Sequence, residues 1–194
     1  IQCERLSHCM ETYMGKPQAT NLSDEINEAV MRNVITNLRR LIRNPDDDFA
    51  RGELMWASAM AENGMLKLGK QTDFQCHMIE HAVGAYTDCN HGQGLAVIHP
   101  ALYRRLLEAG KEKLARMAET VWGVKGTTIE ETAMRGIEAL EAFIREIGLP
   151  THWSEMGITD ESMLRAAADT CFITPGCCRQ LTRDEIFEQL MERM

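Results

Sequence analysis

The sequence predicts an all-α domain, and three observations support this prediction. Apolar residues recur at the three- and four-residue spacing of an amphipathic helix in one segment after another. Capping residues mark where these segments begin, and glycine or Asn-Pro marks where they end. No stretch of five residues alternates apolar and polar side chains with the β-branched enrichment of a strand. A length of 194 residues, 44% of them apolar, suffices for one domain over residues 1–194 with a sizeable core.

The first half of the chain contains four expected helices. They cover, in order, about residues 1–14, 21–43, 46–65 and 74–86. The second has the clearest apolar stripe, formed by Ile26, Val30, Val34, Leu38, Leu41 and Ile42. Either Ser23 or Asn21 is expected to cap it, and it ends at Asn44-Pro45. The acidic run Asp46-Asp47-Asp48 then places negative charge where a helix dipole favours it.

The second half contains four more expected helices. They are one that carries Leu95, Ile98, Leu102 and Leu106, one that begins near residue 129, and shorter ones over residues 159–171 and 182–194. The pattern Thr182-x-x-Glu185 opens the last of these helices. Two overlapping capping boxes, Thr127-x-x-Glu130 and Thr128-x-x-Glu131, open the one that begins near residue 129. Its buried stripe is expected to comprise Ile129, Ala133, Ile137, Leu140, Ile144 and Ile147.

Composition excludes several classes of protein. The net charge is −8 without a basic stripe, which argues against binding to nucleic acid or to anionic membrane surfaces. No run of 18 apolar residues is present, so no transmembrane helix is expected. Seven cysteines without a secretory leader favour reduced thiols and a cytoplasmic location. The chain opens at Ile1, not Met, within an expected helix, so we expect either that an upstream segment was removed or that this is a piece of a longer protein.

Histidines provide the main candidates for chemistry. Glu4 and His8 are four residues apart, so a helix places both on one face, and the same holds for His77 and His81. His91 follows in an Asn-His-Gly segment that is expected to be a loop. Imidazoles combined with a carboxylate suit Fe²⁺ or Zn²⁺. Two ligands from one helix and two from another segment would form a four-ligand site.

Two other interpretations stay open at this point. The segment His77-Met78-Ile79-Glu80-His81 matches the H-x-x-E-H pattern of a class of zinc peptidases, in which the two histidines bind the metal and Glu80 activates water. That reading requires a third, distant ligand and a sheet that the sequence does not predict. The histidine pairs can also be incidental to the helices that carry them. A further alternative is a non-catalytic helical domain whose metal site has decayed.

The histidine segments resemble the iron-containing (group III) alcohol dehydrogenase family, in particular its NADP-dependent butanol dehydrogenase-like branch. The resemblance lies in Cys76–Tyr86 and Asn90–Val97, where His91 follows His77 by fourteen residues within H-G-x-G-L-A. The helix Glu4-x-x-x-His8-x-x-Glu11-x-Tyr13 also resembles the family pattern D-x-x-x-H-x-x-E-x-Y. The resemblance spans essentially all 194 residues. It implies the helical C-terminal domain of the dehydroquinate synthase-like fold.

The resemblance also implies a site. It makes Glu4, His8, His77 and His91 ligands of Fe²⁺ or Zn²⁺, with Glu4 standing where the family has Asp. It places His81 beside the nicotinamide and the substrate, as a catalytic and cofactor-binding residue. The implied activity is NAD(P)-dependent interconversion of small alcohols and aldehydes by hydride transfer, with the metal acting as a Lewis acid.

Part of the family architecture is missing from this sequence. The glycine-rich loop that cradles the cofactor pyrophosphate belongs to the family's N-terminal domain, and no such loop is found among these residues. We therefore expect NADP or NAD to be bound mainly by a domain outside this chain, and the chain alone to be inactive. A homodimer is expected from the same resemblance.

Overall fold

The computed structural model describes the backbone of residues 2–194 and the side chains of residues 4–194, and it is helical throughout, as predicted. The α-helices are α1 (Gln2–Met14), α2 (Leu22–Arg43), α3 (Asp48–Glu62), α4 (Gln75–Thr87), α5 (His91–Met117), α6 (Ile129–Glu146), α7 (Glu161–Thr170) and α8 (Arg183–Met191). Short helical turns occur at Met65–Lys67, Ala118–Trp122 and Trp153–Met156. Over the described residues, β pairing is limited to one isolated antiparallel bridge between Lys16 and Gln71.

The caps read from the sequence explain where several helices begin. Asn21 caps α2, and its side chain accepts a hydrogen bond from the Asp24 backbone amide. Thr182 and Glu185 form a complete capping box at α8. Of the two overlapping boxes before α6, the structure uses Thr128 as the N-cap.

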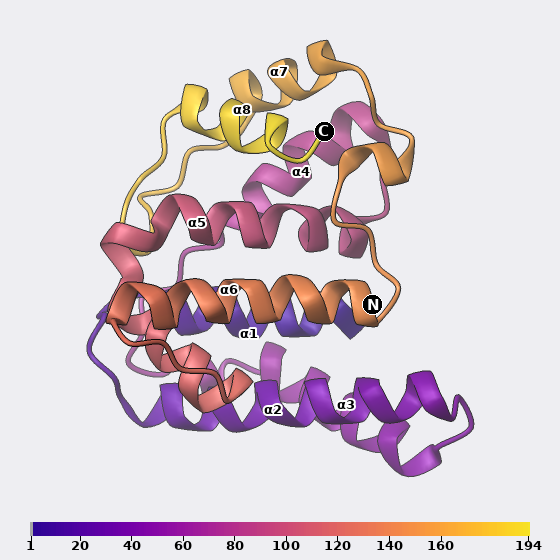
Figure 1. Cartoon of the computed structure of the whole chain (residues 1–194), viewed down its shortest axis with the longest axis vertical. Helices are drawn as coiled ribbons and strands as arrows, with labels where there is room; N and C mark the ends of the chain where they lie inside the picture. Colours follow the sequence, from indigo (N-terminus) through magenta and orange to yellow (C-terminus); the bar gives the residue numbers. More distant parts are fainter. Residues whose placement is uncertain (1) are drawn as a thin grey trace.

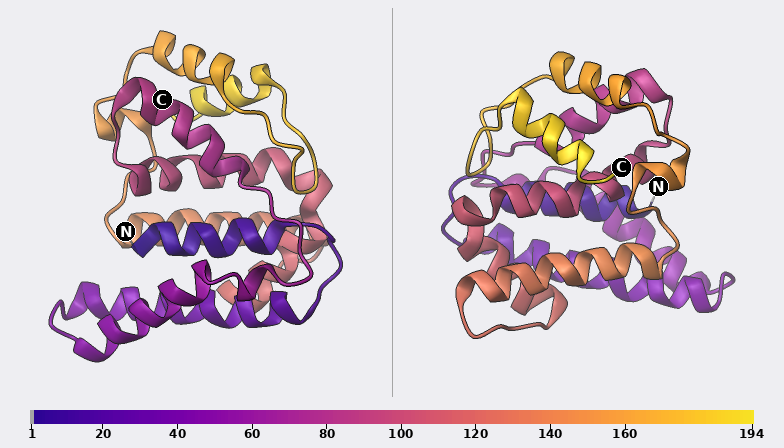
Figure 2. Two further views of the ribbon diagram at one scale, coloured as in Figure 1. Left: turned by 180° about the vertical axis from the view of Figure 1, so that it is seen from behind. Right: turned by 45° about the horizontal axis from the view of Figure 1, so that its top comes forward.

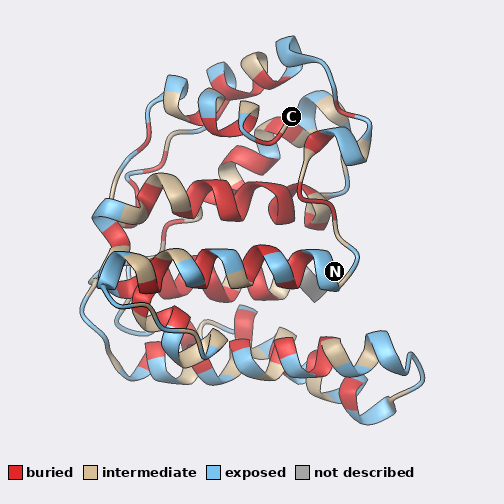
Figure 3. Cartoon of the chain, viewed as in Figure 1, coloured by how far each residue is buried: buried red, intermediate tan, exposed pale blue. Residues whose placement is uncertain are grey.

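Helices α1 and α5 lie in the middle of the molecule, between α2 and α3 at one end and α4, α7 and α8 at the other (Figures 1 and 2). Helices α2 and α3 form a hairpin at one end of the molecule, and α1 packs against both. Helix α5 packs against α1, α6, α4 and α8. At the other end, α7 packs against α4 and α8. The inner faces of these helices are buried (Figure 3). The large buried side chains include Tyr13, Leu95, Phe143 and, in the short turn after α6, Trp153.

Some details differ from the sequence-based expectations. Ile42 and Ile129, assigned to apolar stripes, are each 49% exposed because they lie at helix ends beyond the packed face. The third helix ends at Glu62 rather than Met65, since a turn with left-handed Gly64 follows it. Among residues 2–194, none of the helices combines the length and apolarity needed to cross a membrane.

Candidate metal centre

Three helices bring four histidines together. His8 comes from α1, His77 and His81 from α4, and His91 from the start of α5. The ring centroids of His8 and His77 are 4.5 Å apart, and those of His77 and His91 are 5.3 Å apart. The His81 ring lies 5.3 Å from that of His91 and 6.1 Å from that of His77. The structure therefore gathers the histidines that the sequence singled out, although the first and last are far apart along the chain.

The sequence predicts a loop at His91, but His91 is the first residue of α5. Asn90 caps this helix, and its side chain accepts a hydrogen bond from the Gln93 amide at 3.2 Å. The turn between α4 and α5 is therefore limited to residues 88–90. Because the helix begins at His91, the Cα–Cβ bond of this residue is set by a regular backbone rather than by a loop.

His77 lies in a buried environment that leaves one of its ring nitrogens without a partner. Its side chain is buried, and its Nδ1 contacts the carboxylate of Glu11. Its Nε2 is buried and has no hydrogen-bond partner in the described structure. Burial, followed by the charges of His91 and His81, lowers the pKa of His77 to about 4. The ring is therefore neutral near pH 7, and an unpartnered buried nitrogen of this kind fits a bound metal ion.

The Glu11 carboxylate is buried behind His77. It accepts hydrogen bonds from the backbone amides of Cys76 at 2.6 Å and His77 at 3.3 Å. Burial raises the pKa of the Glu11 carboxyl, and these two amides act in the opposite direction. A cation held by the His77 ring would further favour the ionised carboxylate, because opposite charges stabilise one another.

His8 and Glu4 lie one helical turn apart on α1. Burial, and after it the charge of His77, lowers the pKa of His8. The charge of Glu4 raises the pKa of both His8 and His77, which places its carboxylate within electrostatic reach of the two rings. Glu62, at the end of α3, was not anticipated from the sequence, yet its Oε1 lies 2.5 Å from Nδ1 of His8.

Glu80 is buried between α4 and α5, where its carboxylate contacts Nδ1 of His91. Ligand atoms of Glu80, His81 and His91 all lie within 4.8 Å of one another. His81 itself is exposed to solvent. A peptidase would need Glu80 to face a catalytic water, so the burial of Glu80 against His91 disfavours the H-x-x-E-H reading.

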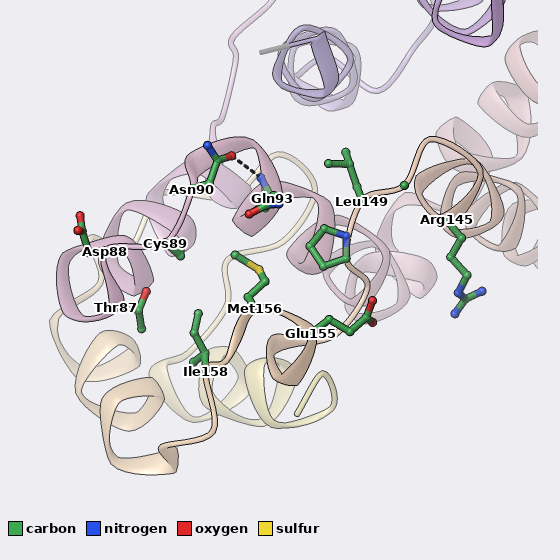
Figure 4. A pocket seen from close by; sticks show the side chains of 12 residues that line it. Thr87, Asp88, Cys89, Asn90, Gln93, Arg145, Leu149, Glu155, Met156 and Ile158 are labelled. Carbon is green, nitrogen blue, oxygen red and sulfur yellow. Dashed lines mark hydrogen bonds between the residues drawn. The ribbon is translucent and has the colours of Figure 1, made fainter. Parts of the chain in front are cut away.

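A cavity of about 600 Å³ opens beside the start of α5 (Figure 4). Asn90 and Gln93 line one side of it, joined by the hydrogen bond that caps α5. The segment after α6 lines the other side with Leu149, Glu155 and Met156. Asn90 and Gln93 flank His91 in the sequence, but none of the four clustered histidines lines this cavity.

The fold and the site define a helical domain with a candidate metal centre built from imidazoles and a carboxylate. Residues 3–194 match the C-terminal model of the Fe-containing alcohol dehydrogenase family, and the chain belongs to that family. The expected family and fold are thereby confirmed.

Known relatives agree with this assignment. The chain is 32% identical to NADH-dependent butanol dehydrogenase A of Clostridium acetobutylicum over 188 residues, which are 94% of this chain and 48% of that protein. It is 30% identical to the NADPH-dependent aldehyde reductase YqhD of Escherichia coli over 156 residues, covering 80% of this chain and 40% of that protein. The chain thus spans about half the length of these curated relatives.

A solved structure has the same fold. The NADH-dependent butanol dehydrogenase A of Thermotoga maritima superposes with a TM-score of 0.91 at 29% identity, over 99% of this chain and 50% of that one. The substrate- and cofactor-free aldehyde reductase YqhD of Escherichia coli gives a TM-score of 0.90 at 26% identity. The names of these relatives include both NADH and NADPH, so they do not single out one nucleotide.

Proposed function

We propose that this chain is the metal-binding, catalytic half of an NAD(P)-dependent oxidoreductase that interconverts small alcohols and aldehydes. The observation that carries the proposal is the buried Nε2 of His77, which has no protein partner and lies among the rings of His8, His81 and His91. We assign the metal ligands as Glu4, His8, His77 and His91. The donor set suits Fe²⁺ or Zn²⁺.

When bound, the metal supplies Lewis-acid chemistry for the oxygen of the alcohol or aldehyde. The residues of the chain have separate tasks around it. His77 is neutral and buried, so it offers a nitrogen lone pair without first losing a proton. His81 is exposed beside His91, and we assign it the exchange of the substrate proton with solvent.

The nucleotide is assigned mainly to a separate N-terminal domain. The support is that this chain covers 48% of the Clostridium enzyme and 40% of the Escherichia coli enzyme. Residues 1–194 are accordingly one metal-binding domain, and either NADP or NAD is its partner cofactor. We further propose that the protein is a homodimer, in keeping with the family resemblance. We also propose a cytoplasmic location, in keeping with seven cysteines, an odd number that favours reduced thiols.

Metal binding by the chain tests the ligand assignment. Co²⁺ is added stepwise to the wild type and to His77→Ala, and binding is followed by visible absorption. His152→Ala serves as the matched control, because His152 is a partly exposed histidine that pairs with Glu155 and is not one of the four clustered histidines. We expect His77→Ala to lose binding and His152→Ala to retain it. Equal binding by all three proteins would refute the assignment, and no binding by the wild type would favour a decayed site.

A further inference from the structure

Two buried carboxylates stand directly behind two of the assigned ligands. Glu11 is 3% exposed and contacts Nδ1 of His77, while Glu80 is 2% exposed and contacts Nδ1 of His91. In both pairs the carboxylate occupies Nδ1, and in His77 the other nitrogen, Nε2, is buried without a hydrogen-bond partner. An imidazole whose Nδ1–H donates to a carboxylate carries its lone pair on Nε2, the nitrogen left for a metal.

Glu11 also joins the two helices that carry His8 and His77. Helix α4 begins after Phe74, which provides no side-chain cap for its first amides. Glu11, three residues after His8 on α1, accepts hydrogen bonds from the Cys76 and His77 amides instead. A carboxylate is favoured at this position by the helix dipole. One side chain therefore caps α4, contacts the His77 ring and ties that ring to the helix of His8.

Glu80 does the corresponding work between α4 and α5. It lies on α4 and reaches the first residue of α5 across the short turn at residues 88–90. Gly94 makes room for it, since a Cβ at that position would lie 2.8 Å from both Cγ and Oε1 of Glu80. The thiol of Cys89 donates to the same carboxylate, with Sγ 3.8 Å from Oε1. These contacts restrict the Glu80 side chain to the position that meets His91.

We propose that Glu11 and Glu80 are positioning residues of the metal centre, each fixing the orientation and tautomer of one histidine ligand so that its Nε2 faces the ion. The proposal rests on the proposed function, because it takes His77 and His91 to be ligands. Hydrogen bonds of this kind orient a ligand ring and raise its basicity. Their loss weakens metal affinity by about 10- to 100-fold in characterised metal sites.

The test compares Co²⁺ affinity in the wild type, Glu11→Gln and Glu80→Gln. Glu28→Gln is the matched control. Glu28 lies on α2 and is also buried, but it accepts its hydrogen bonds from Tyr13 at 2.8 Å and Arg116 at 2.6 Å rather than from a histidine. We expect about 10- to 100-fold weaker Co²⁺ binding in both site variants and unchanged binding in the control. Far-UV circular dichroism establishes that each variant is folded, and if one site variant does not fold, the other decides by the same criterion.

Histidine ring ¹⁵N spectra of the Zn²⁺-loaded chain add a readout that a purely structural role would not change. We expect the wild type to contain Nδ1–H rings at His77 and His91, and each site variant to alter the signals of its own partner ring. Unchanged spectra together with wild-type affinity would overturn the proposal, as would an equal loss of affinity in Glu28→Gln.

Failure of the underlying function gives a different pattern. If His77→Ala and His91→Ala bind Co²⁺ as the wild type does, the ligand assignment is wrong and the positioning proposal falls with it. If these two variants lose binding while both glutamine variants keep it, only the positioning proposal is refuted. A loss in Glu80→Gln as complete as that in His91→Ala would make Glu80 a ligand and would also overturn the proposal.

Discussion

The close approach of α4 and α5 makes Gly94 a sensitive position for both stability and the site. An alanine Cβ there would lie 2.8 Å from Cγ and Oε1 of Glu80, closer than carbon and oxygen atoms tolerate. Glu80 cannot simply rotate away, because it is buried and its carboxylate contacts His91 and Cys89. The substitution Gly94→Ala must therefore displace Glu80, move α5, or both.

The magnitude follows from two opposing terms. Alanine is favoured over glycine inside a helix by about 0.5–1 kcal/mol, because it loses less backbone entropy on folding. Inserting a methyl group into a packed interior costs about 1–3 kcal/mol. We therefore expect Gly94→Ala to lower the free energy of unfolding by about 1–2 kcal/mol.

Gly52 provides the matched control for this prediction. It lies within α3, and a Cβ added there meets nothing within 4 Å. Gly52→Ala should therefore raise the free energy of unfolding by about 0.5–1 kcal/mol. The two variants should then differ by about 1.5–3 kcal/mol, which at about 2–4 °C per kcal/mol for a domain of this size is a difference in Tm of about 3–12 °C.

Urea unfolding followed by circular dichroism measures both variants against the wild type. The same samples are then tested for Co²⁺ binding, which should weaken in Gly94→Ala and not in Gly52→Ala. A Gly94→Ala protein as stable as Gly52→Ala, with unchanged metal affinity, would refute the close-packed arrangement of Glu80 against α5.

Three further predictions follow from other parts of the chain. Asp24 accepts hydrogen bonds from the buried amino groups of Lys70 and Lys113 at 2.6 Å each. Asp24→Asn should therefore lower the free energy of unfolding, measured in urea, by about 3–5 kcal/mol, because it leaves buried positive charge without its partner. A loss below about 1 kcal/mol would contradict this expectation. Hydrogen bonds from Thr127 lower the pKa of Glu131 from 4.5 to about 2, so its contribution to stability is present above pH 4.5 and is lost as the pH falls toward 2. Glu131→Gln should then flatten the pH dependence of unfolding in that range, and an unchanged curve would count against it. Finally, the 194-residue chain should oxidise butanol poorly with NAD or NADP, because little holds the nicotinamide in position. A protein that also contains the family's N-terminal domain should be active and metal-dependent. Comparable turnover by the chain alone would place the nucleotide site within these residues.

The sequence predicted the features that depend on local chemistry. Asn21 and Thr182 are capping residues in the structure as they are in the sequence pattern, because a cap requires only the residues beside it. The helical spacing also placed His77 and His81 on one helix, as the structure has them. Helix ends were less accurate, because packing rather than propensity decides whether a last turn forms.

Contacts between distant helices were not predictable in the same way. Glu11 lies three residues after His8 on α1, and this spacing and its match to the family pattern around His8 were the signals that it faces the site. Its contact with His77 depends on how α1 crosses α4, which no local pattern encodes. The contact of Glu62 with His8 and the burial of Lys113 against Asp24 arise from the same long-range packing.

X-ray absorption spectroscopy of the Zn²⁺-loaded chain tests the central claim most directly. The account predicts one tightly bound ion surrounded only by nitrogen and oxygen at about 2.0–2.2 Å, with the scattering of three imidazoles and a carboxylate. The imidazole contribution should fall by one ring in His8→Ala, His77→Ala or His91→Ala. Sulfur at about 2.3 Å, or an imidazole count that does not change in these variants, would contradict a site built from Glu4, His8, His77 and His91.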